Sequence, residues 1–428
     1  MASTLYLGQT VEDGSLIELP VSTLARHMVV LGASGSGKTV ACKAIVEEAV
    51  RNRIPVIAID PQGDIASLAL RGESERMRRA GVSFGISEDY WKNVDVKIWT
   101  PGSNMGLPIS LAPNLCFDEL EGEPKQRIMT NAAKAMSAMC GFGGKSEDAA
   151  VAAFCTIFEY ADRYRIAIDG LSDFMAILND PPGQLLHELD PLFSERDRAA
   201  AIKHLLVKMR GPQRMMLNGI PIHVDTLFGY DEGGAYDQGK TRVSVIYLNT
   251  LMDQEDKDIF VASLANAIYS WMLQKPADHP VGLVYLDEAA PYMPPVRKPI
   301  TKEPLSLLMR QARKYGVSML VATQSPGDLD YKALGQVGTR LLGRMSTHQE
   351  AAKILPYLSA AEQEEFEGIM EHLASLPTGQ FVLSSPDVYP GPVMMKVRWL
   401  VSDHRTLEPE VLESLVSPAD RKRYSLQG

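Results

Sequence analysis

The sequence predicts an α/β fold in which helices flank a mainly parallel sheet. Short apolar runs, such as MVVL at 28–31 and VIAI at 56–59, alternate along the chain with segments whose apolar positions recur at helical spacing. Several of these runs end directly in glycine or acidic residues, as strands do at the carboxyl edge of a parallel sheet. With 428 residues, the chain is long enough for one large α/β domain that carries an insertion.

The most informative motif is GASGSGKT, from Gly32 to Thr39. It fits the phosphate-loop pattern G-x-x-x-x-G-K-[ST] and lies between a predicted strand and a predicted helix at 40–50. Glycines allow backbone N–H groups to point at phosphate oxygens, and the helix N-terminus adds positive potential. We expect Lys38 to contact the β- and γ-phosphates and the Thr39 hydroxyl to hold Mg²⁺. The predicted nucleotide contacts are Gly35, Ser36, Gly37, Lys38, Thr39 and Val40.

The composition limits the possible partners. A formal net charge of −10 argues against a protein that coats nucleic acid with a basic surface, although a ring could still grip nucleic acid through a few residues in its pore. No apolar run approaches the ~20 residues that span a bilayer, and no signal peptide is visible, so we expect a soluble, cytoplasmic protein without membrane contact. The scattered cysteines indicate buried thiols rather than disulfides or a zinc site; they are Cys42, Cys116, Cys140 and Cys155.

Two polar residues near predicted strands have open interpretations. Residues 1–25 are expected to form two strands with a turn at 12–14, leading to Arg26. Its spacing from the phosphate loop is too great for easy contact with its own nucleotide, so Arg26 either faces a neighbouring subunit or is a solvated charge. Asp60, at the end of the strand 56–59, either orients Mg²⁺ or water, or caps the following turn.

The character of the chain changes between 111 and 235, where helical periodicity replaces strand-like runs. We predict a helical insertion there, between core segments at 1–110 and 236–400, with a polar tail at 401–428. Within the insertion, GFGGKSED at 141–148 is either a mobile loop that exposes Phe142 and Lys145 to a polymer or an ordinary connection between helices.

A second motif, YLDEAAPYMPP at 285–295, runs from a predicted strand into Asp287 and Glu288. Two carboxylates at the end of a buried strand need a metal ion or water nearby, unless they form an acidic pair that faces solvent. In a phosphate-loop protein, Asp287 would hold Mg²⁺ through water and Glu288 would be the general base for the attacking water. The next predicted strand ends in Gln324, whose amide can donate and accept and therefore suits sensing of a γ-phosphate.

Taken together, these motifs resemble the HerA and FtsK group of phosphate-loop motor ATPases, and HerA most closely. RHMVVLGASGSGKT is similar to the HerA entry strand and phosphate loop, and IDPQGD and YLDEAAPYMP resemble its D-P-H-G and D-E-A-H segments, with Gln62 and Ala290 in place of histidines. RKYGVSMLVATQSPGDLD and GTRLLGRM resemble the sensor region, and LPTGQFVLSSP with KVRW resembles the closing hairpin. The resemblance runs from about Leu7 to Val401.

The resemblance implies a RecA-like P-loop core that assembles into a hexameric ring, binds ATP between subunits and moves along double-stranded DNA in its centre. It matches Arg313 to an arginine that contacts phosphate and Arg26 to one offered across the subunit interface. An arginine supplied in this way makes hydrolysis depend on assembly. The resemblance also supports the roles given above to Lys38, Thr39, Asp287, Glu288 and Gln324.

One departure from the HerA pattern concerns partners. HerA proteins usually carry a small β-barrel before the ATPase domain, which docks a nuclease, whereas only about 25 residues precede Arg26 here. We therefore expect no such barrel. The chain is either a minimal motor or one with a partner, which would be a NurA-like nuclease or a different effector. The alternative to a DNA motor is a switch protein in which ATP controls assembly with a protein effector and DNA is not moved. A small-molecule kinase fits less well, because paired carboxylates followed by a glutamine suit water as the nucleophile.

Overall fold

The computed structural model describes residues 4–110, 121–168, 170–211, 215, 217, 219–358 and 360–424. The strands within these residues are β1 (Thr4–Thr10), β2 (Leu16–Pro20), β3 (Met28–Leu31), β4 (Val56–Asp60), β5 (Val94–Pro101), β6 (Leu107–Ile109), β7 (Thr241–Tyr247), β8 (Gly282–Leu286), β9 (Val317–Thr323), β10 (Thr339–Leu342), β11 (Gln380–Ser384) and β12 (Val393–Val397). They form one sheet in the order β2-β1-β12-β11-β10-β3-β9-β8-β4-β7-β5-β6.

The sheet has a parallel part and an antiparallel part. Every neighbouring pair from β10 across to β6 is parallel. The remaining pairs, from β10 out to the edge strand β2, are antiparallel. All residues of β3, β4, β7, β8 and β9 are buried, which explains the largely apolar runs of β3, β4 and β8 in the sequence. The predicted α/β class with a mainly parallel sheet is confirmed.

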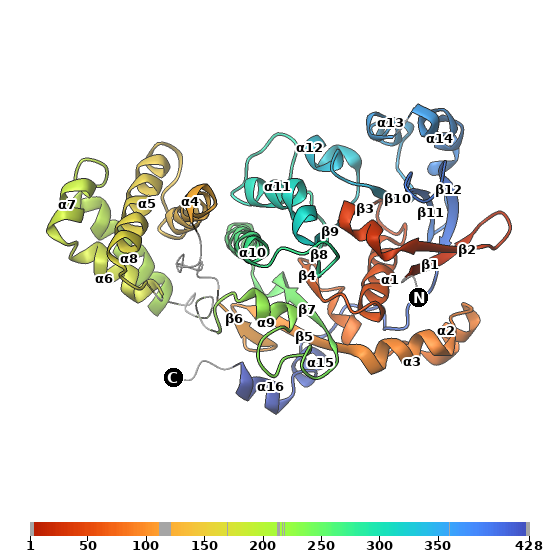
Figure 1. The fold of residues 1–428 in the computed structure, drawn as a ribbon, viewed down its shortest axis with the longest axis horizontal. Helices are drawn as coiled ribbons and strands as arrows, with labels where there is room; N and C mark the ends of the chain where they lie inside the picture. The colour runs from red at the N-terminus through yellow and green to blue at the C-terminus, as the bar shows by residue number, and fades with distance from the viewer. Residues whose placement is uncertain are drawn as a thin grey trace.

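Helices cover both faces of this sheet (Figure 1). The α-helices are α1 (Lys38–Arg51), α2 (Ser74–Arg79), α3 (Phe84–Asn93), α4 (Gly122–Met139), α5 (Glu147–Tyr164), α6 (Leu171–Asn179), α7 (Gly183–Leu189), α8 (Glu195–Arg210), α9 (Val224–Phe228), α10 (Gln254–Gln274), α11 (Lys302–Gln311), α12 (Tyr331–Leu334), α13 (His348–Ala352), α14 (Ala360–Leu373), α15 (Pro409–Ser414) and α16 (Pro418–Arg423). Short 3₁₀ turns connect several of them, including η1 (Val21–Arg26) and η6 (Ala312–Tyr315). Side chains of α1 and α3 pack in one core and those of α10 and α11 in the other, so the sheet lies between two apolar layers.

Helices α4 to α8 form a lobe beside α10, on the left of Figure 1. The lobe joins the same core as α10, and Asn131 of α4 donates a hydrogen bond of 2.8 Å to Asn266 of α10. Phe142 packs edge-on against Phe154 and Phe193, so the 141–148 segment is an ordinary connection between α4 and α5, although Lys145 is exposed. The proposed domain boundaries stay a prediction, and residues 111–120 lie outside the described residues.

The first and the last strands of the chain pair in the antiparallel part of the sheet. The predicted hairpins β1–β2 and β11–β12 are present, and β1 pairs with β12, with Gly8 opposite Val397. The segment after 400 is not simply a polar tail, because it carries α15 and α16 and buries Leu407 and Leu412.

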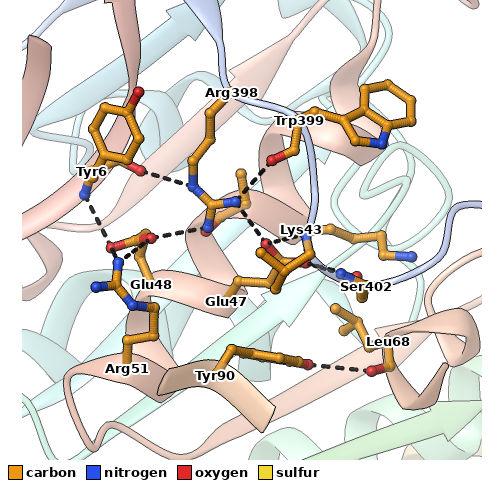
Figure 2. A network of polar contacts seen from close by, with 12 residues as sticks. Tyr6, Lys43, Glu47, Glu48, Arg51, Leu68, Tyr90, Arg398, Trp399 and Ser402 are labelled. Carbon is orange, nitrogen blue, oxygen red and sulfur yellow. Dashed lines mark hydrogen bonds and ion pairs between the residues drawn. The ribbon is translucent and has the colours of Figure 1, made fainter. Parts of the chain in front are cut away.

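A buried network of charges attaches α1 to the chain that follows β12 (Figure 2). Arg398 is 5% exposed and donates hydrogen bonds of 2.8 Å to Glu47 and 2.9 Å to Glu48, both fully buried on α1. Glu47 also accepts hydrogen bonds from the backbone and hydroxyl of Ser402, and buried Lys43 donates to the carbonyl of Asp403. The helix that follows the phosphate loop is therefore fixed by residues from the far end of the chain.

Two further predictions can be compared with the fold. None of the helices in the described part of the chain has the length and apolar character of a membrane span. Cys42 and Cys140 are buried free thiols, whereas Cys155 is only half-buried and Cys116 lies outside the described residues.

Candidate active site

The phosphate loop leaves the carboxyl end of β3 and enters α1 at Lys38, as predicted. Gly35 and Gly37 have φ angles of 74° and 97°, which favour glycine. A Cβ atom on Gly32 would lie 2.7 Å from the Ser36 hydroxyl, so the loop is too tight for a larger residue there. The loop therefore has a tight turn at these positions, where a residue with a Cβ atom would be strained or would clash.

The ammonium of Lys38 and the hydroxyl of Ser36 lie at the loop as hydrogen-bond donors that could bind an anion. The Lys38 ammonium is folded back on the loop, with Nζ 2.5 Å from the Gly32 carbonyl oxygen and 3.4 Å from that of Ala33. Burial lowers the pKa of Lys38, while the nearby carboxylates Glu288 and Asp287 raise it. The Ser36 hydroxyl is buried and has no hydrogen-bond partner among the described residues. A bound polyphosphate would provide oxygen acceptors for both groups.

The paired carboxylates follow β8 and occupy the same edge of the sheet. Asp287 is 6% exposed, and burial raises its pKa to about 6, although a hydrogen bond from a tyrosine opposes the shift. Glu288 is half-buried and has a left-handed backbone with φ of 52°, which is unfavourable for a residue with a Cβ. The acidic pair therefore faces the phosphate loop rather than open solvent, and its backbone is strained.

Gln324 lies beside Glu288, as the motif predicts. Its Nε2 donates a hydrogen bond of 3.2 Å to Glu288 Oε2, and the Thr323 hydroxyl lies 3.4 Å from Glu288 Oε1. Strands β3, β9 and β8 are adjacent and parallel, so their carboxyl ends bring Lys38, Glu288 and Gln324 together. Residues that are far apart in the sequence thus form one site.

Asp60 is buried at the end of β4, and the structure favours its role as a turn cap. Its carboxylate accepts four backbone hydrogen bonds, of 2.7 Å from Gly63, 3.2 Å from Asp64, 2.9 Å from Ile65 and 3.3 Å from Ala66. Burial, and then the charge of Asp287, raise the pKa of Asp60 to about 7, against the effect of these donors. With its oxygens occupied in this way, Asp60 shapes the turn beside the site.

The two candidate arginines lie at the opposite edge of the sheet. Arg26 ends η1 just before β3, is 41% exposed in its side chain, and forms an ion pair with Asp387 in the turn between β11 and β12. Arg313 is exposed in η6, before the first residue of β9. Since β9 has seven residues, about 20 Å separate its two ends. Neither arginine is therefore brought to the phosphate loop of its own chain.

Three residues near the loop were not given a role from the sequence. Arg344 follows β10 and lies with Nη2 3.3 Å from the Ser34 carbonyl oxygen. Thr378 donates a hydrogen bond of 2.8 Å to the Gly35 carbonyl, and the Gly379 backbone donates one of 2.9 Å to that of Ser36. The GTRLLGRM strand and the LPTGQ turn are visible in the sequence, but their placement against the loop depends on the pairing of β10 with β3.

The side chains near the loop suit a magnesium ion that is bound together with a nucleotide. They are less suited to bind a metal ion alone. Within the described ranges, no three His, Cys, Asp or Glu side chains are grouped as a metal site. Magnesium in a phosphate loop takes a hydroxyl, phosphate oxygens and water, with a carboxylate behind the water. Thr39 at the start of α1 and Asp287, which follows β8, are the residues that could supply these protein groups. Val40, the remaining predicted contact, is half-buried next to Thr39.

Part of the chain is similar to a known protein family. Residues 5–111 match the family model described as "Helicase HerA, central domain". The "DNA double-strand break repair helicase HerA" of Sulfurisphaera tokodaii is 24% identical over 163 residues, which is 37% of this chain and 32% of that protein. The chain thus matches about one third of the length of this relative.

Solved structures match a larger part of the chain. VirB4 of Thermoanaerobacter pseudethanolicus has a TM-score of 0.58 at 14% identity, over 94% of this chain and 97% of its own. The plasmid coupling protein TrwB in complex with ADP and Mg²⁺ has a TM-score of 0.55 at 13% identity, over 94% of this chain and 92% of its own. At such low identity these matches concern the fold. The resemblance to HerA that the sequence predicted is therefore confirmed by the family model over residues 5–111, and the solved structures share the fold of this chain over most of its length.

Proposed function

We propose that the protein is a Mg²⁺-dependent ATPase that works as a ring and uses hydrolysis to move along or unwind double-stranded DNA. The proposal rests on one observation. At the carboxyl ends of the adjacent parallel strands β3, β9 and β8, the structure brings together Lys38, Asp287, Glu288 and Gln324. The name of the HerA relative and the bound ADP and Mg²⁺ of TrwB support the choice of DNA and ATP. A nuclease or another effector would be its partner.

The proposed chemistry is attack of water on the γ-phosphorus. Glu288 accepts the proton of the attacking water while the bond between the γ-phosphorus and the bridging oxygen breaks, which gives ADP and inorganic phosphate. Gln324, held against Glu288, orients that water or detects the γ-phosphate. Lys38 neutralises negative charge on the phosphates, and Arg344 adds a second positive charge at the loop. Magnesium, held through Thr39 and Asp287, would supply further charge neutralisation when bound.

The position of the two arginines supports action between subunits. Arg26 and Arg313 lie at the edge of the sheet opposite their own phosphate loop, and both side chains are accessible. In a ring, this edge of one subunit would face the nucleotide of the next. Each site would then be completed by its neighbour, so hydrolysis would require assembly.

The proposal is tested by steady-state ATPase assays of the wild type and Glu288→Gln, each with and without linear duplex DNA, together with the mass of the oligomer in ATP. We expect a hexamer whose turnover is stimulated by DNA in a salt-sensitive manner and is lost in the variant. Turnover that is indifferent to DNA in a protein that stays monomeric would contradict the motor and favour the ATP-controlled switch. In that case, stimulation by a protein partner would be the next measurement.

A further inference from the structure

Tyr285 is a buried tyrosine whose hydroxyl contacts the candidate magnesium residue Asp287. The two residues are two positions apart at the end of β8, so their side chains leave the same face of the sheet. Tyr285 is fully buried, and its hydroxyl donates a hydrogen bond of 2.9 Å to Asp287 Oδ1. A carboxylate held at one oxygen has lost much of its freedom to rotate.

The position of Tyr285 is itself fixed by the neighbouring strands and by helix α1. On the sheet, Tyr285 is paired with Ala58 of β4 and Leu320 of β9, and it belongs to the core that α1 covers. Cys42, on α1, is buried and interacts with the same hydroxyl. Because Cys42 is three residues after Thr39, the hydroxyl lies between the helix that carries Thr39 and the strand that carries Asp287.

We propose that Tyr285 is a positioning residue for the magnesium site. Its hydroxyl holds Asp287 through Oδ1, so that Oδ2 is the oxygen left to meet the water of the metal ion. Residues that hydrogen-bond to the groups facing a metal ion orient those groups. Their removal typically lowers metal affinity or activity by about 10–100-fold. The inference rests on the proposed function, because it requires Mg²⁺ and a nucleotide at this site.

If the Tyr285 hydroxyl only stabilised the fold, its removal would not change the response to Mg²⁺. Tyr90 provides the matched control. Tyr90 is also fully buried in the same core, and its hydroxyl donates a hydrogen bond of 3.2 Å to the Leu68 carbonyl rather than to Asp287 or Glu288. Tyr285→Phe and Tyr90→Phe each remove one buried hydroxyl and keep the ring. They should lower stability by similar amounts but differ in their effect on the metal.

The test measures binding of a fluorescent ATP analogue to the full chain while Mg²⁺ is titrated, with thermal unfolding of each variant recorded in parallel. We expect Tyr285→Phe to need at least about tenfold more Mg²⁺ for half-maximal effect, and Tyr90→Phe to titrate as the wild type does. Equal titration of Tyr285→Phe and wild type, or an equal shift in both variants, would overturn the inference and leave the ATPase proposal standing. Wild-type binding that Mg²⁺ does not change would instead overturn the proposed function, and the inference with it.

A double-mutant cycle gives a second test that does not depend on the stability of one variant. If Tyr285 acts through Asp287, the Tyr285→Phe change should shift the Mg²⁺ titration in the wild type but not in an Asp287→Asn background. The same shift in both backgrounds would show that Tyr285 acts by another route, and the inference would fall.

Discussion

Gln324 and Glu288, at the ends of neighbouring strands, are joined by a hydrogen bond of 3.2 Å between Nε2 and Oε2. This contact links the candidate sensor directly to the candidate base. We expect Gln324→Ala to lower kcat by about 10²-fold, because the water and Glu288 lose a group that orients them. The KM for ATP should change little, since Lys38 and the loop remain. A matched loss of kcat and of nucleotide affinity would instead indicate that Gln324 holds the nucleotide.

The backbone of Glu288 gives a prediction in which two variants differ in stability although both are inactive. At φ of 52°, a residue with a Cβ is strained, and glycine is not. We expect Glu288→Gly to be more stable than Glu288→Ala by about 1 kcal/mol, while both variants lose hydrolysis. Chemical denaturation of the three proteins measures the difference. Equal stability of the glycine and alanine variants would show that the left-handed backbone is not a source of strain.

Arg398 is the centre of the network that fixes α1 (Figure 2). Replacing it with methionine removes the ion-pair partner of buried Glu47 and leaves buried Glu48 paired with Arg51 alone, so we expect Arg398→Met to reduce the free energy of unfolding by about 3–5 kcal/mol. Arg78→Met is the control, because Arg78 forms an ion pair with Glu75 while 78% exposed in its side chain and should lose less than about 1 kcal/mol. Similar losses in both variants, measured by urea denaturation, would contradict a structural role for the network.

The buried ring of His27 should make the free energy of unfolding depend on pH. Its Nδ1 accepts a hydrogen bond from the Met319 backbone and its Nε2 donates to the Met309 carbonyl, so the ring is held neutral. Burial lowers its pKa to about 4, and the charge of Arg313 acts in the same direction. The unfolded chain therefore binds a proton first as pH falls below about 6.5, and stability is lost progressively between 6.5 and 4.

The matched variant for this prediction is His27→Gln, whose amide can accept and donate but does not titrate. We expect the difference in unfolding free energy between wild type and variant to shift in favour of the variant as pH is lowered from 7 to 5. A difference that stays constant over this range would show that His27 does not carry the effect.

The sequence was most informative where a motif and a strand coincide. The phosphate loop, Asp287 with Glu288, and Gln324 each follow a continuous apolar run, and parallel pairing alone brings their carboxyl ends together. The contacts of Arg344 and Thr378 with the loop were not predictable in this way, because they depend on which strands are neighbours. Arg398 appeared only as part of a hairpin, since its partners Glu47 and Glu48 look like exposed helix residues when the helix is read alone.

The arginine positions lead to a prediction about shared sites. Arg26 and Glu288 lie at opposite edges of the sheet, so in a ring the Arg26 of one subunit would complete the site that contains the Glu288 of the next. We expect Arg26→Ala and Glu288→Gln proteins to be inactive alone and to regain part of the ATPase activity when mixed, because some interfaces then combine an intact Arg26 with an intact Glu288. The measurement is ATPase turnover across mixing ratios, with a double variant as the control that cannot contribute a complete pair. Absence of recovery in mixtures that demonstrably exchange subunits would place Arg26 outside the shared site, and its ion pair with Asp387 would then be the better account of this residue.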